Sequence, residues 1–275
     1  MSVRQICGYD IKDCQKVMLE IAVEIDRICK KYDIKYVLDA GSALGAVRHG
    51  GFIPWDDDLD IAMLREDYDK FLTVCEREFD GMFFFQNNFT DPEYQYDFAK
   101  VRKNGTIFEE SVQKNYNIHK GVFVDVFPID NVKVNSYKFQ YRLFQFVRGV
   151  RWRKVRFLDG INFKKRIVRT AAWALSILSV YRLNLLLEKV MRWHNKKATE
   201  YVYKICNPGE LKPLQRREFY IERIRIDFDE HRLYISKDYD AFLRERFGDY
   251  MKLPPKNQQK PTHDIISCYL GDEFA

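Results

Sequence analysis

Apolar and polar positions along the first third of the chain recur in periods that predict alternating helices and strands. Residues 11–32 carry an apolar side chain every three to four positions, from Ile11 to Tyr32, which is the period of an amphipathic helix. Asp10 directly precedes this run and is a suitable N-cap residue. Shorter elements follow: a strand over 36–40, a short helix over 42–49 capped by Ser42, a strand over 59–64, a helix over 65–79 and a buried strand over 82–85.

Four further elements are predicted from the same kind of pattern. Residues 96–103 read as a strand that ends at Asn104-Gly105, a dipeptide typical of hairpin turns, so we expect it to pair with a returning strand over 106–108. Residues 121–128 are apolar apart from Asp125 and predict a buried strand. Residues 236–247 predict a helix that ends at Gly248.

An acidic cluster stands at the start of the predicted strand over 59–64. It consists of Asp56, Asp57, Asp58 and Asp60. Crowded carboxylates repel one another unless a cation neutralises them. Residues i and i+2 of a strand point to the same side, so Asp58 and Asp60 share one face and suit a hard divalent cation such as Mg²⁺. The alternative is a solvated acidic loop, but the apolar residues that alternate with the aspartates favour a strand with one side in the core.

Other stretches carry candidate chemistry. Gly41-Ser42 precedes a short helix, whose first N–H groups can hold a phosphate, although an ordinary turn has the same sequence. Lys100 and Arg102 share one face of a strand and either contact substrate phosphates or face solvent. Asp125 is the one charge in an apolar strand, so it is either a third metal ligand or base, or a capped or salt-bridged carboxylate.

Composition places the protein among globular chains. Of its 275 residues, 46% are hydrophobic and 31% charged, and the net charge is +6. The six cysteines are scattered and form no CxxC pair, which indicates reduced thiols and a cytosolic location. The N-terminal residues MSVRQICGYD contain no apolar run of the kind found in signal peptides. We also find no run of about 18 apolar residues, the length of a transmembrane helix.

A basic segment changes this picture. Residues 138–169 contain eleven Lys or Arg and one Asp, so their net charge is 11 − 1 = +10, and aromatic residues are interleaved with them. An apolar run follows over 171–181, with Trp173 inside it, and is too short to span a bilayer. This composition suits attachment to anionic lipid. RNA binding and a solvated helical bundle are alternatives, but no recognised RNA-binding motif is present and we expect no nucleic-acid partner.

Four stretches together carry a family resemblance. The chain resembles the LicD-type phosphotransferase family in GSALGAVRHGGFIPWDDDLDI (41–61), FAKVRKNGTIF (98–108), HKGVFVDVFPID (119–130) and FGDYMKLPP (247–255). The resemblance implies a nucleotidyltransferase-like fold of the α/β (α+β) class, a mixed sheet flanked by helices. The composition of the basic segment, which matches no family motif, adds an inserted basic helical subdomain. On this basis we expect a core over 1–137, a basic helical, membrane-associated insertion over 138–205 and a segment over 206–275 that completes the core.

The resemblance also implies an activity. Family members move a phosphorylated alcohol, typically phosphocholine, from a CDP-activated donor to a glycan hydroxyl. We therefore expect a Mg²⁺-dependent (or Mn²⁺-dependent) transferase that uses a CDP-alcohol, most often CDP-choline. Its acceptor would be a lipid-linked precursor of a cell-surface glycan, teichoic acid or lipopolysaccharide. The expected location is cytoplasmic, peripheral on the inner face of the membrane, with the basic segment on an anionic membrane surface.

Roles follow for the residues that match the family pattern. Asp58, Asp60 and Asp125 would be catalytic and would hold the metal, with Asp125 as an alternative general base. The substrate would be bound by Gly41 and Ser42 through its phosphates, by Arg48, Lys100 and Arg102 through its negative charge, by Trp55 as a candidate for contact with a quaternary ammonium, and by His263.

Two other classes of protein remain compatible with these residues. A metal-dependent glycosyltransferase also uses a DxD pair to bind a nucleotide sugar, and it releases a nucleoside diphosphate instead of CMP. A non-catalytic, membrane-associated scaffold would need neither the metal nor the carboxylates.

Overall fold

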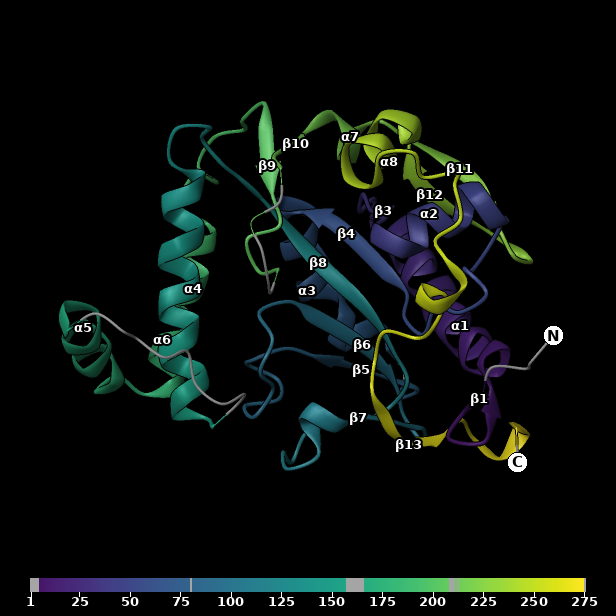
Figure 1. Ribbon diagram of the computed structural model, residues 1–275, viewed down its shortest axis with the longest axis horizontal. Helices are drawn as coiled ribbons and strands as arrows, with labels where there is room; N and C mark the ends of the chain where they lie inside the picture. The colour runs from purple at the N-terminus through teal and green to yellow at the C-terminus, as the bar shows by residue number, and fades with distance from the viewer. Residues whose placement is uncertain (1–4, 80, 157–165, 208–210, 212, 275) are drawn as a thin grey trace.

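A seven-stranded mixed sheet lies at the centre of the protein (Figure 1). Its long strand is β8 (Phe123–Asn131), which pairs in parallel with β4 (Asp60–Leu64) and antiparallel with β6 (Ala99–Lys103). β3 (Val37–Leu38) extends the sheet beyond β4, and β5 (Phe83–Gln86) extends it beyond β6. This computed structural model describes residues 5–79, 81–156, 166–207, 211 and 213–274.

Helices cover the sheet as the apolar periods predict. α1 (Ile11–Lys31) begins at the N-cap Asp10, whose Oδ1 accepts a hydrogen bond from Lys12 N at 2.9 Å. α1 and α3 (Arg65–Glu78) both pack against β8, and their apolar faces fill the core between them and the sheet. The buried residues of α1 include Cys14, Met18, Ile21, Ala22, Ile25 and Ile28.

Two local predictions are wrong. The chain after Asn104-Gly105 does turn, but β7 (Ile107–Glu110) pairs with β13 (Ile265–Tyr269) near the C-terminus and not with β6. Both edges of β6 are already occupied, by β5 and by β8. The second helix, α2 (Ala40–His49), begins two residues earlier than predicted, so Asp39 is the N-cap residue and Ser42 lies inside the first turn.

A helical unit lies beside the sheet and forms the left side of Figure 1. It consists of α4 (Tyr137–Lys154), α5 (Arg166–Ser176) and α6 (Val180–Met191), and α4 begins one residue before the basic insertion predicted over 138–205. The chain then returns to the sheet through β9 (Tyr201–Tyr203), which pairs with the end of β8 and with β10 (Gln215–Arg216).

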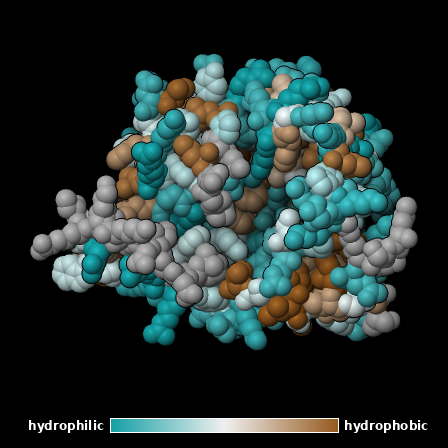
Figure 2. All heavy atoms as spheres, in the orientation of Figure 1, coloured by the Kyte–Doolittle hydropathy of each residue, from teal (hydrophilic) through white to brown (hydrophobic). Residues whose placement is uncertain are grey.

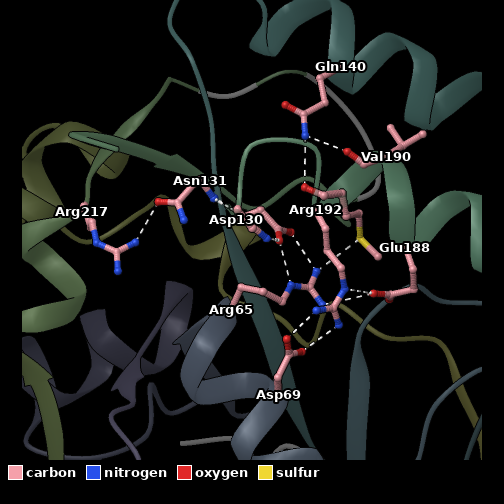
Figure 3. Close-up of polar contacts among 11 residues, drawn as sticks. Arg65, Asp69, Asp130, Asn131, Gln140, Glu188, Val190, Arg192 and Arg217 are labelled. Carbon is pink, nitrogen blue, oxygen red and sulfur yellow. Dashed lines mark hydrogen bonds and ion pairs between the residues drawn. The ribbon is translucent and has the colours of Figure 1, made fainter. Parts of the chain in front are cut away.

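A polar network joins this helical unit to the core (Figure 3). Arg65 of α3 is buried and forms two hydrogen bonds to Asp130 of β8, at 2.7 and 2.9 Å. Arg192, just after α6, donates to Asp69 of α3 at 2.7 Å and to Glu188 at 2.8 Å. The helical unit is therefore tied by ion pairs to α3, which is itself paired with β8 of the sheet.

The C-terminal part of the chain covers the upper right of the sheet and then runs across the front of the molecule (Figure 1). Its elements are α7 (Glu218–Ile221), the hairpin of β11 (Arg223–Phe228) and β12 (His231–Ser236), α8 (Tyr239–Phe247), which ends at Gly248 as predicted, and β13. At the other end of the chain, β1 (Gln5–Ile6) pairs with β2 (Tyr9–Asp10) just before α1.

Candidate functional site

The predicted catalytic carboxylates meet where β4 and β8 lie side by side. Asp60 is the first residue of β4 and is in register with Asp125 of β8, so the two carboxylates are neighbours across the parallel pair. Asp58 lies in the extended segment that leads into β4. Asp60 and Asp125 are both buried. The structure thus brings together the three residues that the sequence proposed as metal ligands.

Burial and mutual repulsion make these carboxylates hard to ionise without a cation. Burial and the neighbouring Asp56 raise the pKa of Asp58 to about 8. Burial, Asp60 and Asp57 raise the pKa of Asp56 to about 7. Burial and Asp58 likewise raise the pKa of Asp60. A cation bound among these groups would favour their charged forms, because its own charge dominates such a site.

The oxygens available at this cluster fit a hard divalent cation. Asp56, Asp57 and Asp58 can each offer a carboxylate oxygen within 4.8 Å of the others. Asp56 Oδ2 is buried and has no hydrogen-bond partner among the described residues. We regard Asp56 as a further potential ligand beside Asp58, Asp60 and Asp125, one that the sequence reasoning did not select.

Asp57 has a different role from its neighbours. It is fully buried, and its carboxylate accepts hydrogen bonds at 3.0 Å from the backbone N–H groups of Thr262 and His263. The Thr262 hydroxyl donates to the same carboxylate at 3.0 Å. Asp57 therefore fastens the C-terminal segment over the site, and of the three adjacent aspartates Asp56 and Asp58 are the ones left to bind a metal.

The Gly-Ser pair shapes the site through its close contacts. The Ser42 hydroxyl oxygen accepts a hydrogen bond from Asp60 N at 2.8 Å, and Asp39 N donates to Asp60 O at 2.9 Å, so the start of α2 is tied to the start of β4. A Cβ atom on Gly41 would lie 2.7 Å from Asp56 Oδ2, so a larger residue here would push the Asp56 carboxylate out of its place. Gly41 and Ser42 thus position the acidic cluster beside the first turn of α2.

A buried ion cluster adjoins this turn. Asp39 is fully buried and forms ion pairs with Arg246 Nη1, at 2.7 Å, and with Lys204 Nζ. Burial would raise the pKa of Asp39, but the two cations outweigh it and the pKa falls to about 2. Lys204 follows β9 and Arg246 lies in α8, so no local sequence pattern could have assigned either to the site.

A cavity of about 370 Å³ opens beside Gly41 and contains both cations. Seen from the side drawn in Figure 1, the surface is hollowed in this region, over the middle of the sheet (Figure 2). Positive charge, helix N–H groups and aromatic surface therefore line one space next to the acidic cluster. The wall is formed by Ala40, Gly41, Tyr203, Lys204, Asn207, Pro213, Leu214, Gln215, Glu245, Arg246 and Phe247.

The two predicted cations of β6 have separate environments. Lys100 Nζ lies 2.8 Å from Asp125 Oδ1 and 3.2 Å from the centroid of the Phe123 ring, so it belongs to the carboxylate site. Arg102 is fully buried and donates to Gln86 Oε1 at 2.5 Å and to Gly121 O at 2.6 Å. These bonds make Arg102 part of the wall behind the site.

His263 is brought to the acidic cluster by the C-terminal segment. Its Nε2 lies 4.0 Å from Asp58 Oδ2 and 3.6 Å from Glu110 Oε1. Burial lowers the pKa of His263, but the hydrogen bond to Asp57 and the charge of Asp58 outweigh it and raise the pKa to about 9. His263 is thus a cation beside the carboxylates, and Glu110 is a further site residue that the sequence did not reveal.

The other two predicted substrate contacts lie at the edge of the site. Arg48 Nη1 donates to Tyr250 O at 2.9 Å, so Arg48 holds the C-terminal segment against α2. Trp55 is partly buried and packs edge-to-face on His49, with 6.1 Å between ring centroids. This contact does not place Trp55 in an aromatic cage.

The sheet, the Gly-Ser pair at the start of α2 and the carboxylates on adjacent strands define a nucleotidyltransferase-type domain. Residues 33–169 match a family model described as the nucleotidyltransferase domain of LicD, FKTN and FKRP. The chain belongs to this LicD family.

Two relatives extend this comparison. The chain is 28% identical over 270 residues to the lipopolysaccharide cholinephosphotransferase LicD of Haemophilus influenzae, covering 94% of this chain and 98% of that protein. It is 39% identical over 54 residues to the human ribitol 5-phosphate transferase FKRP, which covers 20% of this chain and 11% of that protein.

Proposed function

We propose that this protein transfers phosphocholine from CDP-choline to a hydroxyl group of a cell-surface glycan, teichoic-acid or lipopolysaccharide precursor. The names of both relatives describe the transfer of a phosphorylated alcohol, and the bacterial relative matches nearly the whole chain. The observation that carries the proposal is the pairing of a crowded carboxylate cluster with a cation-lined cavity at the start of α2. This pairing suits a substrate that contains a diphosphate.

The proposed cofactor is Mg²⁺, or Mn²⁺. Asp58 and Asp60 would hold it, with Asp56 as a further ligand; Asp125 would be the third ligand only where another group takes the acceptor proton. When bound, the metal would neutralise the negative charge of the donor's diphosphate. The raised pKa values of Asp56 and Asp58 support this role, because a cation would relieve their mutual repulsion.

The protein's own cations complete the donor site in this proposal. Lys204, Arg246 and the first N–H groups of α2 would bind the nucleotide end of the donor in the 370 Å³ cavity. Phe247 would offer a face for the base. His263 would contact the phosphates from the opposite side, because its ring lies beside Asp58.

Transfer itself requires that the acceptor hydroxyl loses its proton. In our proposal the Asp125 carboxylate accepts this proton, the acceptor oxygen forms a bond to the transferred phosphorus, and the bond between that phosphorus and the CMP oxygen breaks. CMP leaves with the electron pair of that bond. Lys100, whose Nζ lies 2.8 Å from Asp125 Oδ1, would hold this carboxylate in position and is placed to stabilise the negative charge that develops on the transferred phosphate.

The test is to incubate the purified protein with Mg²⁺, a glycan acceptor and a panel of CDP-choline, CDP-ribitol and CDP-glycerol, and to measure CMP. We expect CMP release with CDP-choline, loss of release with EDTA, and no turnover in Asp58→Asn or Asp60→Asn. Asp227→Asn is the matched control, because this carboxylate is 80% exposed on β11. Release of a nucleoside diphosphate from a nucleotide sugar would instead identify a glycosyltransferase. Normal turnover in the Asp58 variant would remove the metal-site assignment.

A further inference from the structure

An apolar stripe of four exposed side chains lies on the helical unit. Trp173 and Ile177 at the end of α5, and Tyr181 and Leu185 in α6, are 69%, 71%, 60% and 43% exposed. They follow one another at intervals of four residues across the break between the two helices. Single exposed apolar residues are ordinary, but four on two successive helices mark a candidate contact surface.

Positive charge surrounds the stripe. Residues 166–187 contain no Asp or Glu, and the side chains of Arg169 and Arg182 are exposed. A hollow of about 410 Å³ lies between α4 and α5 and is lined by Arg153, Lys154, Arg169 and Trp173, among others. Lys154 Nζ donates to Ser176 O at 2.8 Å, which holds the two helices together at this point. The hollow therefore combines three cations with an indole ring.

Some of the cations that the sequence analysis assigned to a membrane surface lie inside the protein. Arg151 of α4 is buried and paired with Asp97 at 2.7 Å, and Arg148 is buried and donates to Cys206 O at 3.1 Å. These two cations serve the protein interior. The cations that can meet a partner are those at the end of α4 and around α5 and α6.

We infer that the α5–α6 face docks on an anionic membrane surface. Trp173 and Ile177 enter the interfacial region, and Arg153, Lys154 and Arg169 contact the phosphate groups of the lipids. A two-fold dimer through this face would place its cations against their own copies. Nucleic acid would match the charge but would leave the aliphatic part of the stripe in water. An anionic bilayer can contact both the apolar stripe and the cations around it.

The geometry indicates that the helices lie along the membrane. Among the residues described, no single helix has the length and apolar character needed to cross a bilayer; only Arg169–Ser176 and Val180–Met191 taken together reach it, with a bend of 120° between them. Leu183, Leu187 and Val190 of α6 are buried, and α6 packs against α4. One side of α6 is thus bound to protein, so this pair suits an interfacial position with the opposite stripe in the lipid.

The experiment is sedimentation of the full chain with vesicles of equal parts phosphatidylglycerol and phosphatidylcholine, compared with pure phosphatidylcholine. We expect binding to the anionic vesicles at low salt, weak binding to neutral ones, and partial release at high salt. Trp173→Ser with Ile177→Ser weakens binding at least about tenfold and removes the salt-resistant fraction. Lys154→Gln with Arg169→Gln weakens it by about fivefold per cation and removes the preference for anionic lipid.

The matched control is Met82→Ser with Ile224→Ser, which removes exposed apolar side chains outside α4, α5 and α6. It should sediment like the unaltered protein, and all variants should keep the same CMP release with a soluble acceptor; melting temperatures above that of the assay show that each variant is folded. The inference is overturned if the unaltered protein ignores anionic vesicles at low salt, or if the control loses binding equally. It is also overturned if the Trp173 variant changes only the mass of the protein in solution, which would identify a contact between copies.

Discussion

Replacing Arg65 with Met should destabilise the whole protein, because Arg65 and Asp130 form a buried ion pair with bidentate hydrogen bonds. Arg65 Nε and Nη2 donate to the two oxygens of Asp130 at 2.7 and 2.9 Å, and the side chains are 3% and 0% exposed. The pair joins α3 to β8 next to the helical unit (Figure 3). After the substitution, Asp130 keeps Asn195 Nδ2 as a donor, at 2.6 Å, but has lost its counterion.

The expected loss in the free energy of unfolding is about 3–5 kcal/mol, the range for a buried charge left without its partner. For a chain of this size that corresponds to a fall in melting temperature of roughly 6–20 °C, at about 2–4 °C per kcal/mol. Replacing both partners, as Arg65→Met with Asp130→Leu, removes the uncompensated charge. The double variant should therefore lose less than the sum of the two single variants, by roughly 2 kcal/mol or more.

Urea unfolding of the four proteins measures these differences through the transition midpoints. Arg232→Met is the control, because Arg232 and its partner Asp227 are 63% and 80% exposed, and the midpoint should not move. A loss below about 1 kcal/mol for Arg65→Met would refute the argument that Asp130 depends on this counterion. Simple addition of the single-variant losses would show that the two residues act independently.

Four further outcomes are expected. Asp125→Asn should lower CMP release by about 10²-fold or more while keeping most of the thermal stability, as expected for a general base; normal release with a lower melting temperature would make Asp125 structural. Arg102→Met should lower the melting temperature without weakening CMP binding by the folded fraction, because two buried carbonyl acceptors lose their donor. Asp39 has its pKa lowered to about 2, so its contribution to stability is complete above about pH 4 and is lost as the pH falls toward 2; Asp39→Asn should flatten that part of a melting profile. Asp58 and Asp56 have raised pKa values, so stability without metal should fall as pH rises from about 4 to about 8, and Mg²⁺ should raise the melting temperature more at pH 8 than at pH 5.

Much of the fold could be predicted because the apolar period of each element is local. The helix after Asp10 and the strands that carry Asp60 and Asp125 are found close to their predicted bounds. The prediction of a hairpin after Asn104-Gly105 was wrong, because a turn dipeptide specifies a change of chain direction but not which strand the following residues pair with. β8 and β5 occupy both edges of β6, so β7 pairs instead with β13, which lies more than 150 residues further along the chain.

The basic segment shows a similar limit of sequence reasoning. Counting charges over 138–169 gives their sum, but it does not separate cations that face solvent from those that have buried partners. Arg151 is paired with Asp97, which lies in a different predicted element. The number of cations on the surface is therefore smaller than the sequence suggests, and their position on the α5–α6 face follows only from the packing of α4 against the core.

The aspartates near the site show why residue roles need three-dimensional contacts. Asp56, Asp57 and Asp58 are chemically identical and adjacent, but their contacts differ. The backbone N–H groups of Thr262 and His263 donate to the Asp57 carboxylate, whereas Asp56 Oδ2 has no hydrogen-bond partner among the described residues. The partners that separate them come from the C-terminal segment, about 200 residues away. The same segment supplies Arg246, the partner of Asp39, from α8. The site is thus closed by the last part of the chain, because Arg246 of α8 and, further along, Thr262 and His263 hold the first carboxylates in place.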